Sequence, residues 1–286
     1  MEKATVKNEC KYKLIKEATI TVEGNKLYRI KALKDSKFCK AGDIGGYIEK
    51  VENLSMFDDA WVSGDARVFG DARVFGDARV SGDARVFGDA RVSGDARVSG
   101  DALVSGDAQV FGDAWVSGDA RVSGDAQVFG DAWVSGDARV SGDARVFGDA
   151  RVSGDVWVSG DAQVFDDAWV SGDARVFGDA QVSGDAQVSG DAQVSGDARV
   201  SGDARVSGDA RVHGQMDIIT VLDIGSERGC LTIHRDSAIG VRVTRGCFTG
   251  SIGEFLNAVE FTHGDNIHGK IYKSLIETAK IQFGIE

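Results

Sequence analysis

The sequence predicts a mainly β protein: a parallel β-helix of about nine 18-residue coils, preceded by a small β cap and followed by an α+β module. The first observation behind this fold class is a valine at every sixth position from Val62 to Val212, 26 in all. The second is an alanine two residues before nearly every one of these valines, with Val156 as the exception. A six-residue period suits neither a 3.6-residue helix nor a heptad, but it suits a short strand followed by a tight turn. Valine and alanine, two positions apart, then point to the same inward side.

The third observation is that the remaining positions repeat with three times this period. Serine follows each of the nine valines that are spaced by 18 from Val62 to Val206. The same spacing, or a multiple of it, separates three further sets: Gln109, Gln127, Gln163 and Gln181; Phe111, Phe129, Phe147 and Phe165; and Trp61, Trp115, Trp133 and Trp169. Three six-residue units therefore close one coil, and coils stacked at about 4.8 Å predict a triangular rod roughly 40 Å long.

Each unit also needs a tight turn between its strands. Glycine occupies the turn position in most units, because it adopts left-handed conformations at little cost. Asp58 and Asp166 replace this glycine in two units. Aspartate is among the few other residues that tolerate the left-handed region, so we expect both aspartates to adopt it.

The unit resembles that of left-handed β-helices, in which an aliphatic residue alternates with a small residue four positions later. The resemblance covers roughly the first 210 residues, and it implies a left-handed coil, although most parallel crossovers are right-handed. The segment from Lys40 to Glu49, followed by Asn53-Leu54-Ser55, resembles the entry segment of hexapeptide-repeat β-helix proteins. Such proteins are common in bacterial and phage genomes and are often labelled as transferases.

The repeats divide the chain into three predicted parts: an N-terminal β cap over 1–56, the β-helix over 57–213 and a C-terminal α+β module over 214–286. In the cap, residues 19–22 and 26–33 are predicted to form a hairpin.

In the C-terminal module, strands are predicted over 217–224, 231–234 and 239–244. Ser251 and Glu254 form a capping box before a helix that runs to about Thr262. A second amphipathic helix follows, and its apolar face is predicted to carry Ile267, Ile271, Leu275, Ile276 and Ala279. The stretch 245–250, continuing to 262–266, resembles a C-terminal module of phage and prophage proteins.

Charge and composition limit the classes of function. The chain has a net charge of −12, and residues 57–212 hold 14 arginines against 28 aspartates. So acidic a surface argues against direct nucleic-acid binding through phosphates. Residues 1–14 are charged and lack the apolar core of a signal peptide, and no stretch approaches the roughly 20 apolar residues of a membrane span. Four cysteines without a paired framework fit a reducing compartment. We therefore expect a cytoplasmic protein, of a bacterium or a phage-infected cell, that binds no membrane.

Aromatic residues flank one corner in four coils. The set consists of Phe57, Trp61, Phe111, Trp115, Phe129, Trp133, Phe165 and Trp169. They stand beside the inward valine, so they are expected to point outward along one edge. An exposed aromatic strip marks an interface, although rings that merely stack on one another, or that duplication copied, would give the same pattern. The interface predicts a homo-oligomer, and the resemblance favours a trimer.

The resemblance also raises an acyltransferase, because many left-handed β-helix proteins use acyl-CoA or an acyl carrier protein. Such enzymes resemble one another in a catalytic histidine and a loop that interrupts the coils. The repeats contain no insertion, and no histidine before His213. General-base catalysis needs a group that titrates near pH 7, so His213 is the one candidate base, and a terminal polar residue is the favoured interpretation. No catalytic residue is predicted.

A ligand or partner site is instead predicted near the C-terminus, at His213, Arg245, Cys247, His263, Asp265 and Asn266. Zinc is disfavoured there, because Cys230 and His234 would lie about 13 Å apart on one strand and no C-x₂-C pair exists. The glycine pattern of a calcium-binding roll is missing as well. The sequence predicts no metal and no cofactor.

Three functions remain open. The first is a non-enzymatic, homo-oligomeric binding or scaffold protein of bacterial or phage origin, with coils for assembly and the C-terminal module for recognition. The second, which rests on the phage resemblance, is a counter-defence protein that captures a host immune protein or a small nucleotide signal, or imitates DNA through its acidic coils. The third is the acyltransferase.

Overall fold

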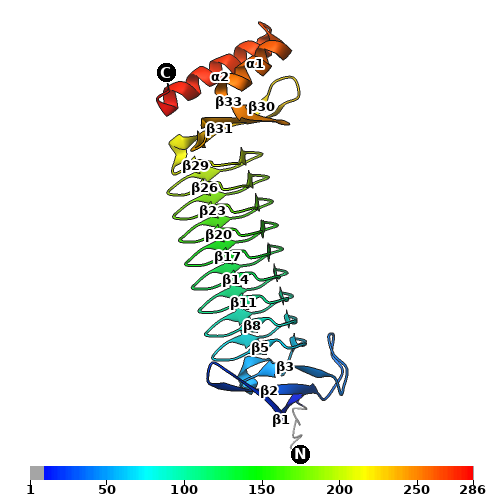
Figure 1. The fold of residues 1–286 in the computed structure, drawn as a ribbon. Helices are drawn as coiled ribbons and strands as arrows, with labels where there is room; N and C mark the ends of the chain where they lie inside the picture. The colour runs from blue at the N-terminus through cyan, green and yellow to red at the C-terminus, as the bar shows by residue number, and fades with distance from the viewer. Residues whose placement is uncertain (1–9, 286) are drawn as a thin grey trace, which may run out of the picture. The chain divides into compact units, whose positions relative to one another are not determined.

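The structure, a computed structural model, describes residues 10–285. The chain is mainly β and contains a parallel β-solenoid of about nine turns, which confirms the predicted fold class (Figure 1). It divides between Gly130 and Asp131 into two compact units, each described by itself. In both units the parallel strand pairs follow the predicted 18-residue spacing, so the expected coil length is confirmed. The left-handed sense and the division at 56/57 and 213/214 stay predictions.

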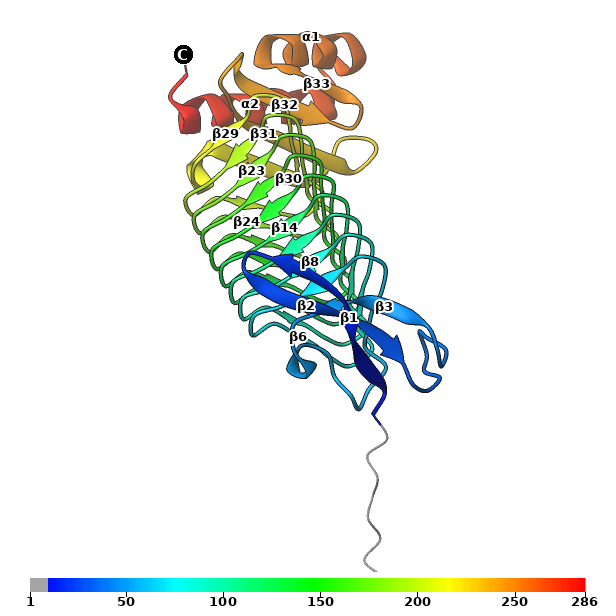
Figure 2. The ribbon, with the colours of Figure 1, turned by 60° about the horizontal axis from the view of Figure 1, so that its bottom comes forward.

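The first unit begins with a β-hairpin and a third strand: β1 (Tyr12–Val22), β2 (Asn25–Ala32) and β3 (Ile44–Ile48), followed by the short helix η1 (Val51–Asn53). The hairpin predicted over 19–33 is present but longer, since its pairing extends back to Tyr12 opposite Ala32. Figure 2 shows β1, β2 and β3 next to the first coils.

The third strand joins the hairpin to the first coil. β3 pairs antiparallel with β2 and parallel with the coil strand that begins at Arg67. Gly46 permits the close approach, because a Cβ there would lie 2.6 Å from the carbonyl oxygen of Ala66. The cap therefore supplies partners to backbone groups that an open sheet edge would leave unpaired.

The coils of the first unit place two-residue strands in three parallel sheets. In pairing order, sheet A continues from β3 with β5 (Arg67–Val68), β8 (Arg85–Val86), β11 (Leu103–Val104) and β14 (Arg121–Val122); sheet B has β6 (Arg73–Val74), β9 (Arg91–Val92), β12 (Gln109–Val110) and β15 (Gln127–Val128); sheet C has β4 (Trp61–Val62), β7 (Arg79–Val80), β10 (Arg97–Val98) and β13 (Trp115–Val116).

The coils of the second unit follow the same plan. Sheet A has β17 (Arg139–Val140), β20 (Trp157–Val158), β23 (Arg175–Val176), β26 (Gln193–Val194) and β29 (Arg211–Val212); sheet B has β18 (Arg145–Val146), β21 (Gln163–Val164), β24 (Gln181–Val182) and β27 (Arg199–Val200); sheet C has β16 (Trp133–Ser135), β19 (Arg151–Ser153), β22 (Trp169–Val170), β25 (Gln187–Val188) and β28 (Arg205–Val206).

The repeated valines and alanines form the interior of the coils, as predicted. Every one of them from Val62 to Val212 is buried, and Val156 is buried at a position that holds alanine in the other units. Burial of one valine side chain contributes about 1.5–3 kcal/mol. Because each coil buries these residues against its neighbours, the units are stabilised by contacts between successive coils.

Glycines at the corners let one coil lie directly on the next. Gly94 has φ 68°, and a Cβ there would lie 2.9 Å from the backbone nitrogen of Gly112 in the following coil. Asp166 takes the same left-handed conformation at φ 58°, as predicted. The prediction for Asp58 is wrong, since this residue does not have a positive φ. Its carboxylate instead accepts hydrogen bonds from the backbone N–H groups of Ala60, at 3.2 Å, and Gly76, at 2.6 Å. These two bonds stabilise a backbone conformation of Asp58 outside the left-handed region.

The second unit ends in an antiparallel sheet covered by two helices. The elements are η2 (Gln215–Asp217), β30 (Ile218–Ile224), β31 (Gly229–Asp236), β32 (Gly240–Arg245), β33 (Phe248–Ser251), α1 (Ile252–His263) and α2 (Ile267–Phe283). The three predicted strands and both helices are confirmed, whereas β33 was not predicted. The predicted capping box is also present: Ser251 Oγ accepts from the Glu254 N–H at 3.3 Å, and the Glu254 carboxylate accepts from the Ser251 N–H at 2.8 Å.

The predicted apolar face of the second helix is partly wrong. The side of α2 that packs on the sheet carries Gly269, Tyr272, Ile276, Ala279 and Phe283. Ile276 and Ala279 belong to this side as predicted, but Ile267 and Ile271 are exposed. Ile267 and Ile271 are four residues apart and therefore share a second apolar stripe of the helix. The stripe that packs on the sheet is the one that carries the aromatic residues Tyr272 and Phe283.

The last coil is joined to the C-terminal sheet through main-chain and side-chain contacts. Ala210 forms an antiparallel bridge with Asp236 at the end of β31, and the Ser237 N–H donates to the Asp209 carbonyl oxygen at 3.0 Å. The Thr232 hydroxyl accepts from the backbone N–H of Arg205 at 3.0 Å. The sheet therefore provides partners for the final coil, as β3 does for the first.

An ion pair stabilises the turn that follows β31. Asp236 is buried, and its carboxylate accepts from Arg242 Nε at 2.6 Å and from the backbone N–H groups of Ala238 and Ile239. Burial alone would raise the pKa of Asp236, but the hydrogen bonds from Arg242, Ala238 and Ile239 outweigh it and lower the pKa below its usual value.

Within residues 10–285, no helix has the length and apolar character needed to cross a membrane.

The stacked corners predict that Gly94→Ala destabilises the protein more than Gly42→Ala. Both glycines have positive φ, so alanine costs about 1–2 kcal/mol at either position. Only at Gly94 would the new Cβ also collide with the backbone of the next coil, since nothing lies within 4 Å of a Cβ at Gly42. Thermal unfolding followed by circular dichroism measures the two midpoints, and equal losses would contradict direct coil-on-coil stacking.

Asp236→Asn is predicted to destabilise the protein at neutral pH by roughly 3 kcal/mol, because it leaves the Arg242 cation without its buried partner. The pKa of Asp236 is lower in the folded chain, so its contribution is complete above the unfolded value near 4 and is lost as the pH falls through the folded value. Unfolding midpoints at several pH values should therefore show wild type and variant converging below about pH 4. A constant difference between pH 7 and pH 3 would contradict this account.

Candidate functional site

The predicted aromatic edge is only partly exposed in the first unit. Phe57 is 86% exposed, but Trp61 is 5% exposed, so the expectation that Trp61 points into solvent is wrong. Lys11, at the start of the hairpin, lies beside this side chain: its ammonium is 6.0 Å from the centroid of the Trp61 ring. The same ammonium donates to the carbonyl oxygens of Asp58, at 2.7 Å, and Ala60. Burial lowers the pKa of Lys11, although the nearby Asp58 opposes this shift.

The other members of the edge form stacks and rows, as their regular spacing predicts. Phe111 stacks on Phe129 with ring centroids 4.9 Å apart, and Phe147 stacks on Phe165 at 5.0 Å. Parallel rings at this distance are an offset arrangement that stabilises neighbouring coils. The stacking alternative raised from the sequence therefore accounts for these phenylalanines.

The tryptophans of sheet C occupy a different environment. Trp115 Nε1 donates to Ser99 Oγ at 3.2 Å, and Trp169 Nε1 donates to Ser153 Oγ at 3.4 Å, so each ring is anchored to the preceding coil. Trp133 and Trp169 are nevertheless 41% and 47% exposed. These two rings are the part of the predicted edge in the second unit that offers an apolar surface to a partner.

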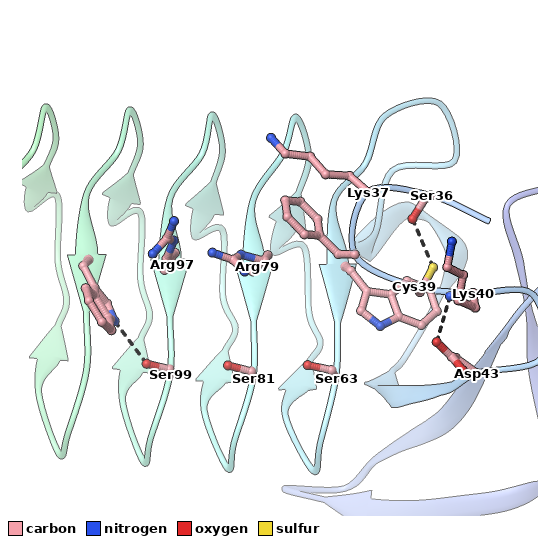
Figure 3. Close-up of a pocket in the computed structure, with 13 residues that line it drawn as sticks. Ser36, Lys37, Cys39, Lys40, Asp43, Ser63, Arg79, Ser81, Arg97 and Ser99 are labelled. Atoms are coloured by element: carbon pink, nitrogen blue, oxygen red, sulfur yellow. Dashed lines mark hydrogen bonds between the residues drawn. The ribbon is translucent and has the colours of Figure 1, made fainter. Parts of the chain in front are cut away.

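A cleft that the sequence analysis missed lies on sheet C of the first unit. It has a volume of about 770 Å³ and is lined by Lys37, Arg79 and Arg97 (Figure 3), and also by Phe38 and the tryptophan of β13. Arg79 and Arg97 form its floor, and the Ser63, Ser81 and Ser99 hydroxyls follow beside them. The signal was present in part, because Trp61, Arg79, Arg97 and Trp115 occupy the same position in four successive coils. Nothing in the sequence shows which loop lies over them.

The C-terminal candidates separate into three groups. Arg245, Cys247 and His263 line one pocket of about 270 Å³, together with Phe248 and Tyr272. Arg245 donates from Nε to the Tyr272 hydroxyl at 3.0 Å and from Nη2 to the Ile224 carbonyl oxygen at 2.8 Å. Its guanidinium is therefore held at the pocket by the helix α2 and the strand β30, while Cys247 is exposed at the rim.

Asp265 and Asn266 lie in the turn between the two helices and do not line this pocket. The Asn266 side chain accepts from the Gly269 N–H at 3.0 Å, so it serves as the N-cap of α2. Asp265 is 3.5 Å from the Lys273 ammonium at the surface. Both residues thus have structural partners in the turn.

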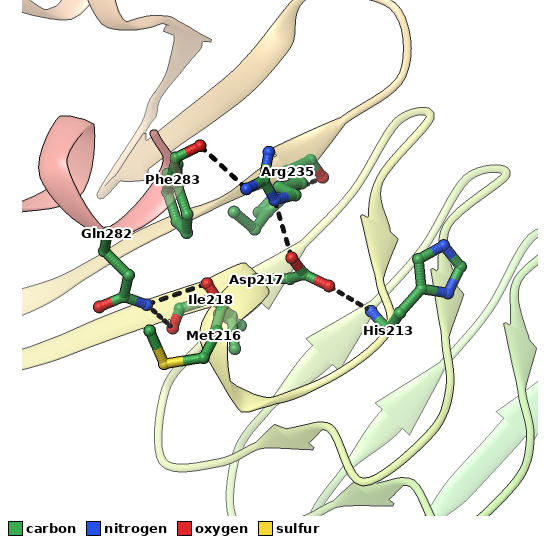
Figure 4. Close-up of polar contacts among 8 residues, drawn as sticks. His213, Met216, Asp217, Ile218, Arg235, Gln282 and Phe283 are labelled. Carbon is green, nitrogen blue, oxygen red and sulfur yellow. Dashed lines mark hydrogen bonds and ion pairs between the residues drawn. The ribbon is translucent and has the colours of Figure 1, made fainter. Parts of the chain in front are cut away.

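His213 lies at the last coil and is separate from the pocket. Its Nδ1 is 2.7 Å from the hydroxyl of Ser195, which stands one coil earlier and is buried. Asp217 accepts from the backbone N–H of His213 at 2.9 Å (Figure 4). A serine–histidine pair can form a nucleophile when a third group orients the imidazole ring. Asp217 contacts the backbone and not the ring, and acyl transfer through His213 stays a hypothesis.

The contacts around Asp217 connect three elements of the second unit. Arg235 Nε donates to Asp217 at 2.8 Å, and Arg235 Nη2 donates to the Phe283 carbonyl oxygen at 2.9 Å (Figure 4). The Gln282 amide donates to the Met216 carbonyl oxygen at 3.0 Å. Together they tie η2, β31 and the end of α2, so the polar cluster at His213 joins the coils to the module.

Among residues 10–285, no group of three or more histidine, cysteine, aspartate or glutamate side chains is placed to hold a metal ion. His234, one of the zinc candidates considered, is fully buried, and its Nδ1 lies 3.0 Å from the Arg235 carbonyl oxygen. Burial lowers its pKa, which favours the neutral ring. His263 and His268 have ring centroids 5.7 Å apart beside Tyr272.

Comparison with known proteins bears on the coils. A family model described as the YdcK beta solenoid repeat matches residues 66–82, 78–94, 84–100, 90–106, 96–112, 144–160, 168–184, 180–196, 186–202, 192–208 and 198–214. A comparison with curated proteins finds no match. The coils in both units are therefore similar to the YdcK beta solenoid repeat.

Proposed function

We propose that this chain is a non-enzymatic, homo-oligomeric binding protein of bacterial or phage origin that acts in the cytoplasm. The coils serve assembly, and the C-terminal module serves recognition of a partner. The observation that carries this proposal is the pair of exposed tryptophans, Trp133 and Trp169, which flank Arg151 on one sheet of the second unit.

Assembly through sheet C is favoured by the chemistry of this surface. Tryptophan and arginine are enriched where proteins associate, because they combine a large apolar area with hydrogen-bonding groups. Arg151 is exposed between the two rings, so the three side chains form one row, which we term the sheet C row. The row repeats at the coil spacing, and this periodicity suits contact with the same row of a second copy. A trimer is the expected assembly.

Recognition by the module is supported by its pocket. The pocket combines the aromatic rings of Phe248 and Tyr272 with a fixed guanidinium, the mixture of apolar lining and few polar groups that is typical of ligand sites. Capture of a host immune protein by a phage protein would be one form of this recognition.

Trp133→Ala with Trp169→Ala is predicted to reduce the mass in solution from a multiple of the chain mass, three times being expected, to that of one chain. The two substitutions remove the apolar area of the sheet C row and leave the interior of the coils unchanged. Light scattering coupled to size-exclusion chromatography measures the mass.

Trp157→Ala is the matched control, because Trp157 is 45% exposed but lies on sheet A, where Arg139 and Arg175 stack over its ring. An equal mass change in both proteins, or none in the double variant, would remove the sheet C row from the assembly.

His263→Ala is predicted to lose partner proteins that the wild type retains from a bacterial lysate, since His263 lines the pocket. Phe261→Ser is the control, because Phe261 is 94% exposed on the same helix and does not line the pocket. Pull-down followed by mass spectrometry compares the three proteins. Loss of partners with Phe261→Ser alone would move recognition from the pocket to the outer face of α1.

A further inference from the structure

The cleft on the first unit has a floor of two arginines between two tryptophans. In the strand register of sheet C, Arg79 lies opposite Trp61, Arg97 lies opposite Arg79, and Trp115 lies opposite Arg97. Phe38, from the loop that follows the hairpin, lies over Arg79. The cleft is therefore made by two segments far apart in the chain, and its volume of about 770 Å³ is in the range of small-molecule sites.

The positive charges of the cleft differ in their partners. Lys37 is neutralised by Asp77 at 2.7 Å and Asp95 at 3.2 Å, and Lys40 pairs with Asp35 at 3.3 Å. Arg79 and Arg97 have no ion pair with any residue that the structure describes, although residues 57–212 hold 28 aspartates. Two adjacent guanidiniums thus line the cleft without an ion-pair partner among the described residues, in a protein whose net charge is −12.

An aromatic ring lies close to each of these guanidiniums. The Arg79 guanidinium carbon is 4.7 Å from the centroid of the Phe38 ring, and that of Arg97 is 5.8 Å from the Trp115 ring. Stacking uses the face of a guanidinium and leaves its in-plane N–H groups available. These N–H groups match the oxygens of a phosphate, which arginine binds through two parallel hydrogen bonds.

We propose that this cleft binds a small molecule that carries a phosphate or diphosphate group, held by Arg79 and Arg97. Strands of adjacent coils are about 4.8 Å apart, so one phosphate or diphosphate can accept hydrogen bonds from both side chains. The Ser63 and Ser81 hydroxyls beside them provide further donors. A phosphate offers more acceptor oxygens than a carboxylate, and this favours it as the ligand.

The site goes beyond the proposed function, because it needs neither the sheet C row nor the C-terminal module. Its chemistry fits two sources, a free phosphate compound or a nucleotide. In a nucleotide, the base would stack on the Trp115 ring, which Ser99 holds in place.

Isothermal titration calorimetry with the full chain tests the proposal, using inorganic pyrophosphate, ADP and adenosine as probes. We expect pyrophosphate and ADP to bind and adenosine not to. Affinity for ADP at least about threefold above that for pyrophosphate would assign the site to a nucleotide, and equal affinities would assign it to a free diphosphate. No heat from either phosphate probe at millimolar concentration, or adenosine binding as tightly as ADP, would overturn the proposal.

Arg79→Gln with Arg97→Gln should weaken pyrophosphate and ADP binding at least about tenfold. Arg73→Gln with Arg91→Gln is the matched control. These two arginines also lie opposite each other on adjacent coils, their substitution removes the same charge, and neither lines the cleft. The control should change affinity less than about twofold. Equal weakening in both would show diffuse charge attraction and overturn the site. Arg97→Gln alone, at an exposed side chain, repeats the test with the smallest change to the fold.

Discussion

Within each unit, the rest of the structure depends on one coil lying directly on the next with the same residues in contact. Hydrogen bonds such as the one from the Arg79 N–H to the Ala96 carbonyl oxygen, at 2.9 Å, connect each coil to its successor. At most corners glycine over glycine leaves room for two backbones, as at Gly94 and Gly112. Once the backbone is stacked in this way, every outward side chain becomes a member of a column, and the columns determine the chemistry of the surface.

The interior and the surface are therefore under separate constraints. Valine and alanine fill the inside of each coil, and the outward position before each valine can hold arginine, glutamine, tryptophan or leucine without altering that interior. On sheet C the outward column of the first unit has two arginines bounded by tryptophans, and the cap adds Phe38 above them. A surface of mixed charge thus acquires a local site from the arrangement of a few side chains, while the fold beneath stays the same.

The coil length and the inward valines could be predicted, because a strict period constrains both backbone and side-chain direction. Burial of Trp61 could not, since residues outside the repeats, Lys11 among them, lie beside its ring, and no local pattern encodes such contacts. The cleft was missed for the same reason, as Phe38 reaches it from outside the repeats. In α2 the pattern contained two apolar stripes, and only packing on the sheet decides that Tyr272 is buried and Ile267 exposed.

Near-identical interiors, in which only Val156 departs from the pattern, also mean that hydrophobic burial does little to distinguish one coil from its neighbour. If the repeats slid by one whole coil, Val68 would fill the place of Val86 and the same interior would form again. Only features that occur once oppose such slippage: the Lys11 ammonium at the carbonyl oxygens of Asp58 and Ala60, and the bridge between Ala210 and Asp236. The non-repeated ends thus fix the register of the coils, and this register decides which outward side chains become neighbours.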